Sequence, residues 1–248
     1  SWVGDKLVIW DKDTREIIWE WNTFDHYDTQ DYDGAYYALG IYAGSWDNAL
    51  SLFKYDWTHL NSVTYVESEN AIYISCRHLS RITKIYFNDG DYSDTQNGEI
   101  IWNMGTQMPS GEVDCGTDID FSWQHSVSVM ENGNIVFLDN GNLSNDFDNS
   151  LSSPLTRALE VAPNETDGGC AAEIVWEHTL DPSLYGLASG NTQKLENGNY
   201  LISTVADGGT TLEVSPDHSL VWEAKYNLNL GLIHRAYRTS GLYPVDVS

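Results

Sequence analysis

Two histidines stand at matching places in this 248-residue sequence, each two positions after a tryptophan. They are His59 in Trp57-Thr58-His59 and His125 in Trp123-Gln124-His125. A neutral imidazole is a nucleophile and can also take up or give a proton. Arg77 adds a planar guanidinium, whose donors match the oxygens of sulfate or phosphate. Together these side chains suit chemistry on a tetrahedral oxyanion. The alternative interpretation is structural, because polar side chains at strand starts also tie neighbouring elements together.

The elements that must position these residues belong to a repeat. A strand-like pattern ending in Trp and one further residue occurs four times, each time after a turn-rich stretch. β-branched and aromatic residues of this kind favour strands. The copies are Glu16-Ile17-Ile18-Trp19-Glu20, Glu99-Ile100-Ile101-Trp102-Asn103, Glu173-Ile174-Val175-Trp176-Glu177 and Ser219-Leu220-Val221-Trp222-Glu223.

Hairpin signals precede the later copies. Asn132-Gly133 and Asn197-Gly198 each separate a polar strand from an apolar one, and Asn-Gly between such strands is a strong hairpin signal. Each unit therefore holds about four short antiparallel strands, which is the composition of a β-propeller blade. No long stretch of helical periodicity competes with this interpretation.

We therefore expect one all-β domain over residues 1–248, a β-propeller of four-stranded antiparallel blades whose ring is incomplete at the N-terminus. In a propeller the starts of the inner strands surround the central channel, so His59, His125 and His234 should converge there. Either an N-terminal part is missing, or another chain completes the ring. The expected parts are a partial blade at 1–21, a long loop at 22–56, blades at about 57–106, 122–180 and 187–230, and a last inner strand at 232–238.

The charge balance restricts the partners. Acidic residues outnumber basic ones by 37 to 12, which gives a formal net charge of −25. A nucleic-acid partner is not expected, because phosphate binding needs a basic face. No membrane span is expected either, because no apolar run reaches the roughly 18 residues required.

The three cysteines give expectations about redox state. Cys115 and Cys170 lie in polar, glycine-rich loops and are expected to pair, whereas Cys76 lies in an apolar strand and should stay reduced and buried. With the acidic composition, this favours a secreted protein, extracellular or periplasmic.

The long polar segment from Asp25 contains Asp28, Asp31 and Asp33-Gly34. Clustered carboxylates are ligands that calcium takes. The full pattern of a calcium-binding loop is missing, so the favoured interpretation is a solvated acidic loop. We expect no cofactor and no metal at the histidine cluster, with calcium in the acidic loop as the alternative.

Several motifs, in this order, resemble the arylsulfotransferase family over about residues 15–141, and more weakly from there to Pro244. They are Tyr55-Asp56-Trp57-Thr58-His59-Leu60-Asn61-Ser62-Val63, Ser75-Cys76-Arg77-His78-Leu79-Ser80, Gly98-Glu99-Ile100-Ile101-Trp102-Asn103-Met104-Gly105, Phe121-Ser122-Trp123-Gln124-His125 and Phe137-Leu138-Asp139-Asn140-Gly141.

The resemblance implies a propeller that moves a sulfuryl group from a phenolic sulfate donor to a phenol acceptor. The family does this through a sulfated histidine and without a nucleotide donor. By motif, His125 corresponds to the histidine that carries the sulfuryl group. His59, Asn61 and Arg77 correspond to the residues that hold its oxygens and the phenolic oxygen.

Two departures from the family pattern keep a second function open. The family's site uses a further histidine from an earlier blade that is absent here, and Ser126 follows His125 where many relatives have Asp. The alternative is a non-catalytic extracellular propeller that acts as a binding or assembly module. The chain is thus arylsulfotransferase-like if it is active.

Overall fold

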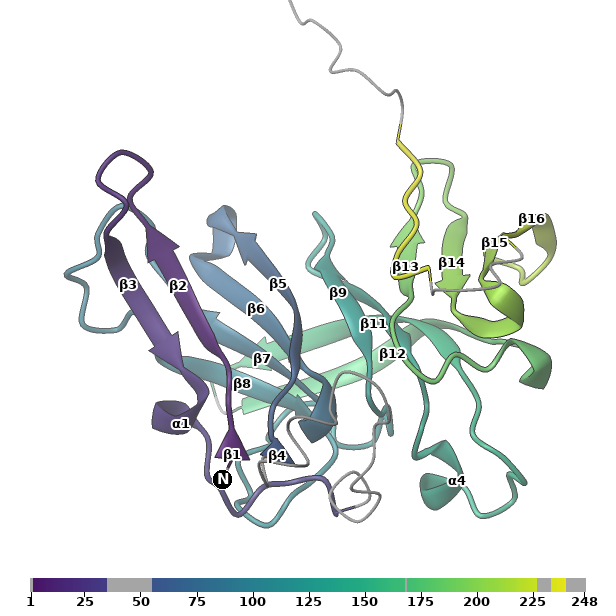
Figure 1. The fold of residues 1–248 in the computed structure, drawn as a ribbon, viewed down its shortest axis with the longest axis horizontal. Helices are drawn as coiled ribbons and strands as arrows, with labels where there is room; N and C mark the ends of the chain where they lie inside the picture. Colours follow the sequence, from purple (N-terminus) through teal and green to yellow (C-terminus); the bar gives the residue numbers. More distant parts are fainter. Residues whose placement is uncertain (1, 35–54, 168, 227–232, 240–248) are drawn as a thin grey trace, which may run out of the picture.

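The structure is a computed structural model that describes residues 2–34, 55–167, 169–226 and 233–239. Most of the expected long loop, at 35–54, lies outside the described residues, as does the end of the expected last blade, at 227–230. The described part is all-β, as expected, and its helices are single turns (Figure 1). These helical turns are α1 (Thr23–His26), α4 (Ser144–Phe147), η1 (Glu67–Glu69), η2 (Arg77–Leu79), η3 (Pro182–Leu184) and η4 (Ala206–Gly208).

The strands form three four-stranded antiparallel sheets and two two-stranded sheets. The first four-stranded sheet contains β5 (Leu60–Val66), β6 (Ala71–Cys76), β7 (Arg81–Tyr86) and β8 (Ile100–Gly105). The second contains β9 (His125–Val129), β10 (Ile135–Asp139), β11 (Arg157–Thr166) and β12 (Gly169–Thr179). The third contains β13 (Asn191–Lys194), β14 (Tyr200–Thr204), β15 (Thr210–Val214) and β16 (Leu220–Lys225). In the two small sheets, β2 (Lys6–Trp10) pairs antiparallel with β3 (Ile17–Asn22), and β1 (Trp2–Val3) pairs parallel with β4 (Tyr55–Asp56).

The repeated tryptophan occupies one register position throughout. In β3, β8, β12 and β16 it follows one extra residue that shifts the register, as a β-bulge does. A bulge re-aims the side chains that follow it, so each tryptophan has the same relation to its neighbouring strand. The pairs are Trp19 with Ile9, Trp102 with Lys84, Trp176 with Glu160 and Trp222 with Glu213.

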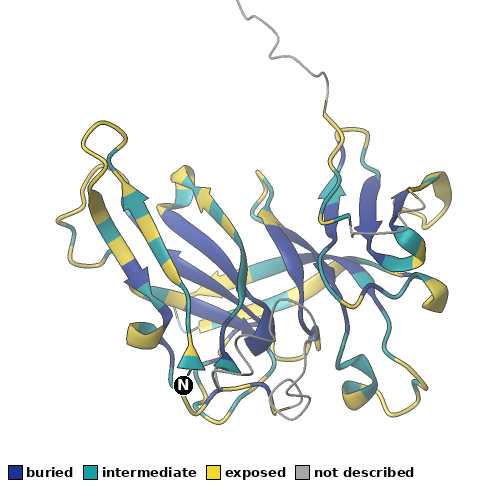
Figure 2. Ribbon diagram, in the orientation of Figure 1, coloured by how far each residue is buried: buried dark blue, intermediate teal, exposed yellow. Residues whose placement is uncertain are grey.

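Successive sheets pack against each other through three apolar clusters. The first joins Tyr73 and Trp102 of one sheet to Phe137 and Leu159 of the next, and the other two join the remaining neighbours in the same way. Figure 2 shows the result: β6, β10 and β14 are buried along their length, whereas β2 alternates between half-buried and exposed residues. Fully burying a large apolar side chain contributes about 1.5–3 kcal/mol, so these clusters hold the sheets together.

The expected cysteine pairing is confirmed. Cys115 and Cys170 form a disulfide with a Cα–Cα distance of 4.8 Å, and Cys76 is free and buried. Burial raises the pKa of the Cys76 thiol to about 12, so it is protonated at neutral pH.

The first strands of the three large sheets are joined by side chains. Ser62 Oγ accepts a hydrogen bond from Val127 N at 3.0 Å, and Thr64 Oγ1 donates to Val127 O at 3.1 Å. Ser126 Oγ donates to Gly190 O at 2.8 Å, one residue before β13 begins. These bonds bring the starts of β5, β9 and β13 together.

The expected last inner strand, 232–238, differs from the structure. Residue 232 lies outside the described residues, and residues 233–239 form no strand. They lie alongside β13 and run parallel to it (Figure 1). Gly190 N donates one backbone hydrogen bond to His234 O at 2.8 Å, but the next bonds come from the amide side chains of Asn191 and Gln193, so no backbone ladder forms. Within the described residues the sheets form an open arc and do not close into a ring (Figure 1).

Candidate active site

His125 is the first residue of β9 and only 3% of its surface is exposed. Its Nδ1 lies 2.6 Å from Asn140 Oδ1 and 3.1 Å from Trp123 O. Both partners are acceptors, so Nδ1 carries the proton and Nε2 carries the lone pair. The ring is therefore held in one tautomer.

Asn140 is itself fixed by the loop that precedes β13. Its Nδ2 donates to Gly186 O at 2.5 Å and to Ser189 O at 3.1 Å. These two carbonyls determine the orientation of the amide, which leaves Oδ1 facing His125. Asn140 therefore acts on His125 as a positioning residue.

The pKa of His125 is lowered to about 3, first by burial and then by the positive charge of Arg77. Both effects disfavour an imidazolium. At neutral pH the ring is thus uncharged, which is the nucleophilic form.

Arg77 lies in η2, directly after β6, and not within a strand. Its backbone N–H donates to His59 O at 3.2 Å, which places the two residues opposite each other. The guanidinium is buried, with Nη1 2.7 Å from His78 Nε2 and Nη2 donating to Leu187 O at 3.1 Å. It also lies 4.3 Å from the centre of the Trp123 ring, in a cation–π arrangement. The Trp123 indole N–H in turn donates to Asp33.

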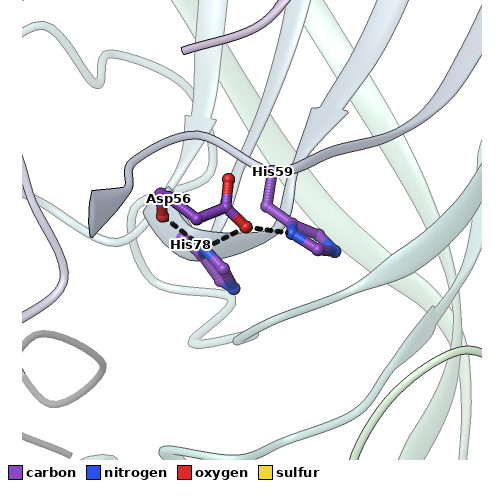
Figure 3. A group of neighbouring side chains, drawn as sticks. All are labelled: Asp56, His59 and His78. Carbon is purple, nitrogen blue, oxygen red and sulfur yellow. Dashed lines mark hydrogen bonds and ion pairs between the residues drawn. The ribbon is translucent and has the colours of Figure 1, made fainter. Parts of the chain in front are cut away.

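His59 belongs to a second polar group (Figure 3). Its Nδ1 donates to the Asp56 carboxylate, and its ring lies 4.5 Å from the ring of His78, centre to centre. His59 has a positive φ of 49° and its side chain is 36% exposed. The carboxylate fixes the ring, so Nε2 is its basic atom.

Asp56, His59 and His78 form one grouping of three potential metal ligands in the part of the chain that the structure describes. The hydrogen bonds disfavour a metal there. His78 Nδ1 donates to Asp56 O at 2.7 Å, and its Nε2 accepts from Arg77. Burial first, and then the charges of His59 and Arg77, lower the pKa of His78 to about 2. His78 is therefore a neutral bridge between Asp56 and Arg77.

The acidic loop uses two of its carboxylates internally. Asp31 forms a buried ion pair with Arg81 at 2.6 Å and accepts hydrogen bonds from Ser110. Asp33 accepts the indole N–H of Trp123. These carboxylates are partners of buried donors, which makes a solvated loop an incomplete description of this segment.

Asn61 lies in β5, where the register with β6 shifts. Its Nδ2 donates to Gln124 O at 2.7 Å, next to His125. Its Oδ1 is buried and has no hydrogen-bond partner among the described residues. The amide therefore presents an acceptor that a ligand O–H group could use.

The residues brought together are thus His59, Arg77 and His125, with Asn61 beside them. Arg77 N bonds to His59 O, the Arg77 guanidinium lies over the Trp123 ring, and Asn61 bonds to Gln124 O, directly before His125. His234 lies next to this group, because its Nδ1 is 2.9 Å from the Oγ of Ser189, whose backbone N–H contacts His125.

Two residues that contact the His125 ring were not predicted from the motifs. Ser189 donates its backbone N–H to His125 Nε2 at 3.2 Å, and Asn140 holds Nδ1. Asn140 belongs to the motif Phe137-Leu138-Asp139-Asn140-Gly141. Ser189 lies two residues before β13, close to the place that His59 holds before β5 and that His125 holds at the start of β9. That correspondence was the available signal.

Comparisons with known proteins identify the family of the chain. None of the curated proteins matches the chain. A solved structure, a protein of unknown function from Bacteroides caccae, matches with 18% identity and a TM-score of 0.49. That match covers 95% of this chain and 58% of the other. In the part that the structure describes, no helix has the length and apolar character needed to cross a membrane. The arylsulfotransferase (ASST) family model matches residues 1–227, and the chain therefore belongs to the arylsulfotransferase family.

Proposed function

We propose that this protein transfers a sulfuryl group between phenolic compounds through a sulfo-histidine at His125. The observation that carries the proposal is the state of that ring: a neutral imidazole, held in one tautomer, with Nε2 as its nucleophilic atom. Family membership supports phenolic substrates. The reaction would be a ping-pong exchange without a nucleotide donor or a metal.

In the first step the Nε2 lone pair attacks the sulfur of an aryl sulfate. The N–S bond forms and the bond between the sulfur and the aryl oxygen breaks. The leaving phenolate takes a proton from a nearby acid and departs as a phenol. Positive charge develops on the imidazole as the bond forms. Asn140 Oδ1 and Trp123 O accept from Nδ1–H and therefore stabilise that charge.

In the second step the acceptor phenol attacks the same sulfur. The N–S bond breaks, the electron pair returns to Nε2, and the phenol loses its proton. His59 is the proton carrier in this scheme, because the Asp56 carboxylate orients its ring. Asn61 orients the phenolic oxygen.

Arg77 would neutralise the transferring oxygens. Its charge is permanent and its environment is buried, where an electrostatic interaction is stronger than in water. The ring of Trp123 supports the guanidinium from one face.

The proposed architecture is a propeller in which the three four-stranded sheets are blades. The repeated bulge position of the tryptophans supports it, and further strands would be needed to close the ring. The disulfide supports an oxidising location, extracellular or periplasmic.

One observation favours the non-catalytic alternative. His125 Nε2 already accepts the N–H of Ser189, so a substrate must displace that donor. In the catalytic scheme, Ser189 N–H then turns to an oxygen of the sulfuryl group. In the alternative, it holds a histidine whose role is only to join the sheets.

Trapping the intermediate separates the two. The protein is mixed with 4-nitrophenyl sulfate and no acceptor, then digested and mapped by mass spectrometry, with His125→Ala as the control. We expect an SO₃ adduct on the peptide that contains His125, together with a stoichiometric burst of 4-nitrophenol. A folded protein that gives neither adduct nor burst would favour the non-catalytic propeller.

A further inference from the structure

The segment Ile233–Thr239 is anchored beside β13 by paired hydrogen bonds. Asn191 donates to Ala236 O at 2.8 Å and accepts from Ala236 N at 2.9 Å. Gln193 makes the same pair of bonds with Arg238, at 3.0 and 2.8 Å. Each amide side chain thus takes the place of a neighbouring strand and fixes the backbone of the segment.

This anchoring places two side chains of the segment against the candidate site. His234 contacts Ser189, the residue whose N–H meets His125 Nε2. Arg235 Nη2 donates to Asn61 O at 2.5 Å. The segment therefore contacts the site from both the His125 side and the Asn61 side.

Two polar atoms at this junction have no partner. Arg235 Nε and Asn61 Oδ1 are both buried, and neither has a hydrogen bond within the described part of the chain. A buried, unsatisfied polar group costs about 1–3 kcal/mol, and most such groups in folded proteins are paired. An unpaired donor and an unpaired acceptor on two bonded residues therefore point to a ligand that supplies the complementary groups.

The charges at the site indicate that the ligand group facing Arg235 Nε is an anion. Two of the Arg77 amino groups are already used by His78 and Leu187. His78 and His125 are neutral at physiological pH. The chain as a whole carries a formal charge of −25, which repels an anionic sulfate ester. A second permanent cation at the site would offset that repulsion.

We propose that Arg235 is a substrate-binding residue of this site, with its Nε–H donating to an oxygen of the anionic sulfate ester in the first half-reaction, whereas Asn61 Oδ1 accepts the O–H of the acceptor phenol in the second. This inference rests on the proposed function for the location of the sulfate ester. It places the sulfate ester at the junction between the segment 233–239 and β5. It also gives the site a cation from a part of the chain that is far from the other site residues in sequence.

The test is a binding measurement that does not depend on turnover. The affinity for 4-nitrophenyl sulfate is measured by calorimetry in the His125→Ala background, for proteins with Arg235, Arg235→Ala and Arg235→Lys. The matched control is Arg238→Ala, which removes an arginine of the same segment that pairs with Glu213 at 2.6 Å. Circular dichroism checks the fold of each variant.

We expect Arg235→Ala to weaken binding about 10- to 100-fold, because a hydrogen bond to a charged group is lost. Arg235→Lys should recover only part of the affinity, and Arg238→Ala should change it by less than about 3-fold. The salt dependence of the affinity should also fall in Arg235→Ala. Unchanged binding in Arg235→Ala, an equal loss in both arginine variants, or no binding to the parent protein would overturn the inference.

The two proposals can fail separately. Arg235-dependent binding without a sulfo-histidine in the trapping experiment would refute transfer and keep the Arg235 site. A sulfo-histidine formed at full rate, with equal affinity in Arg235→Ala, would keep transfer and refute the Arg235 site.

Discussion

Asn140 Oδ1 accepts a hydrogen bond from Nδ1 of His125 at 2.6 Å. His125 begins β9, whereas Asn140 directly follows β10 and is held by the loop before β13. This bond determines which nitrogen of His125 has the lone pair. It therefore links the geometry of the third large sheet to the chemistry proposed on the second.

The first prediction follows from that bond. Asn140→Leu should lower kcat by about 10- to 100-fold, as losses of such orienting partners typically do. Asn140→Asp should keep the orientation and raise the pKa of His125, because a carboxylate stabilises the imidazolium. The pH dependence of the sulfation burst measures both effects. Equal bursts and equal pH profiles in the wild type and both variants would show that Asn140 has no orienting role.

Arg77 gives the second prediction. Arg77→Ala should lower the rate of sulfation by about 10²–10³-fold, which is the usual cost of losing one donor to a transition-state oxyanion. The sulfation rate of Arg77→Lys should lie between those of the wild type and Arg77→Ala, since lysine keeps the charge but loses the planar guanidinium that stacks on Trp123. Single-turnover kinetics with 4-nitrophenyl sulfate would measure this. A rate in Arg77→Ala within about 3-fold of the wild type would remove Arg77 from the mechanism.

The third prediction concerns stability and pH. In the folded protein the pKa of His78 is lowered to about 2 and that of His125 to about 3, from an ordinary value of 6.5. At pH values between the folded pKa and the ordinary pKa of each histidine, the unfolded chain binds more protons than the folded one. The free energy of unfolding should therefore fall as the pH drops below 6.5, by up to about 1.4 kcal/mol per pH unit for each histidine.

Urea unfolding at pH values of about 6 and 5 tests this with His78→Gln, whose amide can still bond to Asp56 O and Arg77. The variant should lose less stability between the two pH values, by about 1 kcal/mol. The comparison within one pair of proteins cancels the contribution of the carboxylates. Identical losses in both proteins would mean that His78 is not held neutral by the fold.

The sequence predicted those features that depend on local patterns. The Ile/Val-Trp repeat predicted outer strands because the residues around Trp102 or Trp176 determine the bulge themselves. The Asn-Gly turns predicted the hairpins for the same reason. The disulfide was predicted from the glycine-rich stretches around both cysteines, although Cys170 lies in β12 and not in the expected loop. His59, Arg77 and His125 could be placed near one another because each stands at or next to the end of a strand.

Features that depend on contacts between sheets were not predictable in this way. The bond from Ser189 to His125 Nε2 joins residues 64 positions apart. The bond from Arg235 to Asn61 joins residues 174 positions apart. Residues 233–239 also have the composition of a strand, but the side chains of Asn191 and Gln193 bond to the backbone groups of Ala236 and Arg238, so that no ladder forms. No pattern within a single segment encodes such a contact.

The last prediction concerns the disulfide. Cys115 lies between β8 and β9, and Cys170 lies in β12. The disulfide therefore spans 55 positions and joins the segment that follows the first large sheet to the edge strand of the second. Constraining a loop of that length in the unfolded state stabilises the fold by about 4 kcal/mol. The double variant Cys115→Ala/Cys170→Ala should lose about that much unfolding free energy in urea, and reduced wild-type protein should match it. Cys76 provides the internal control, because burial and a pKa raised to about 12 should keep it from reacting with iodoacetamide until the protein unfolds. If the double variant unfolds at the same urea concentration as the oxidised wild type, the sheets are held by their apolar clusters alone and the disulfide adds nothing to stability.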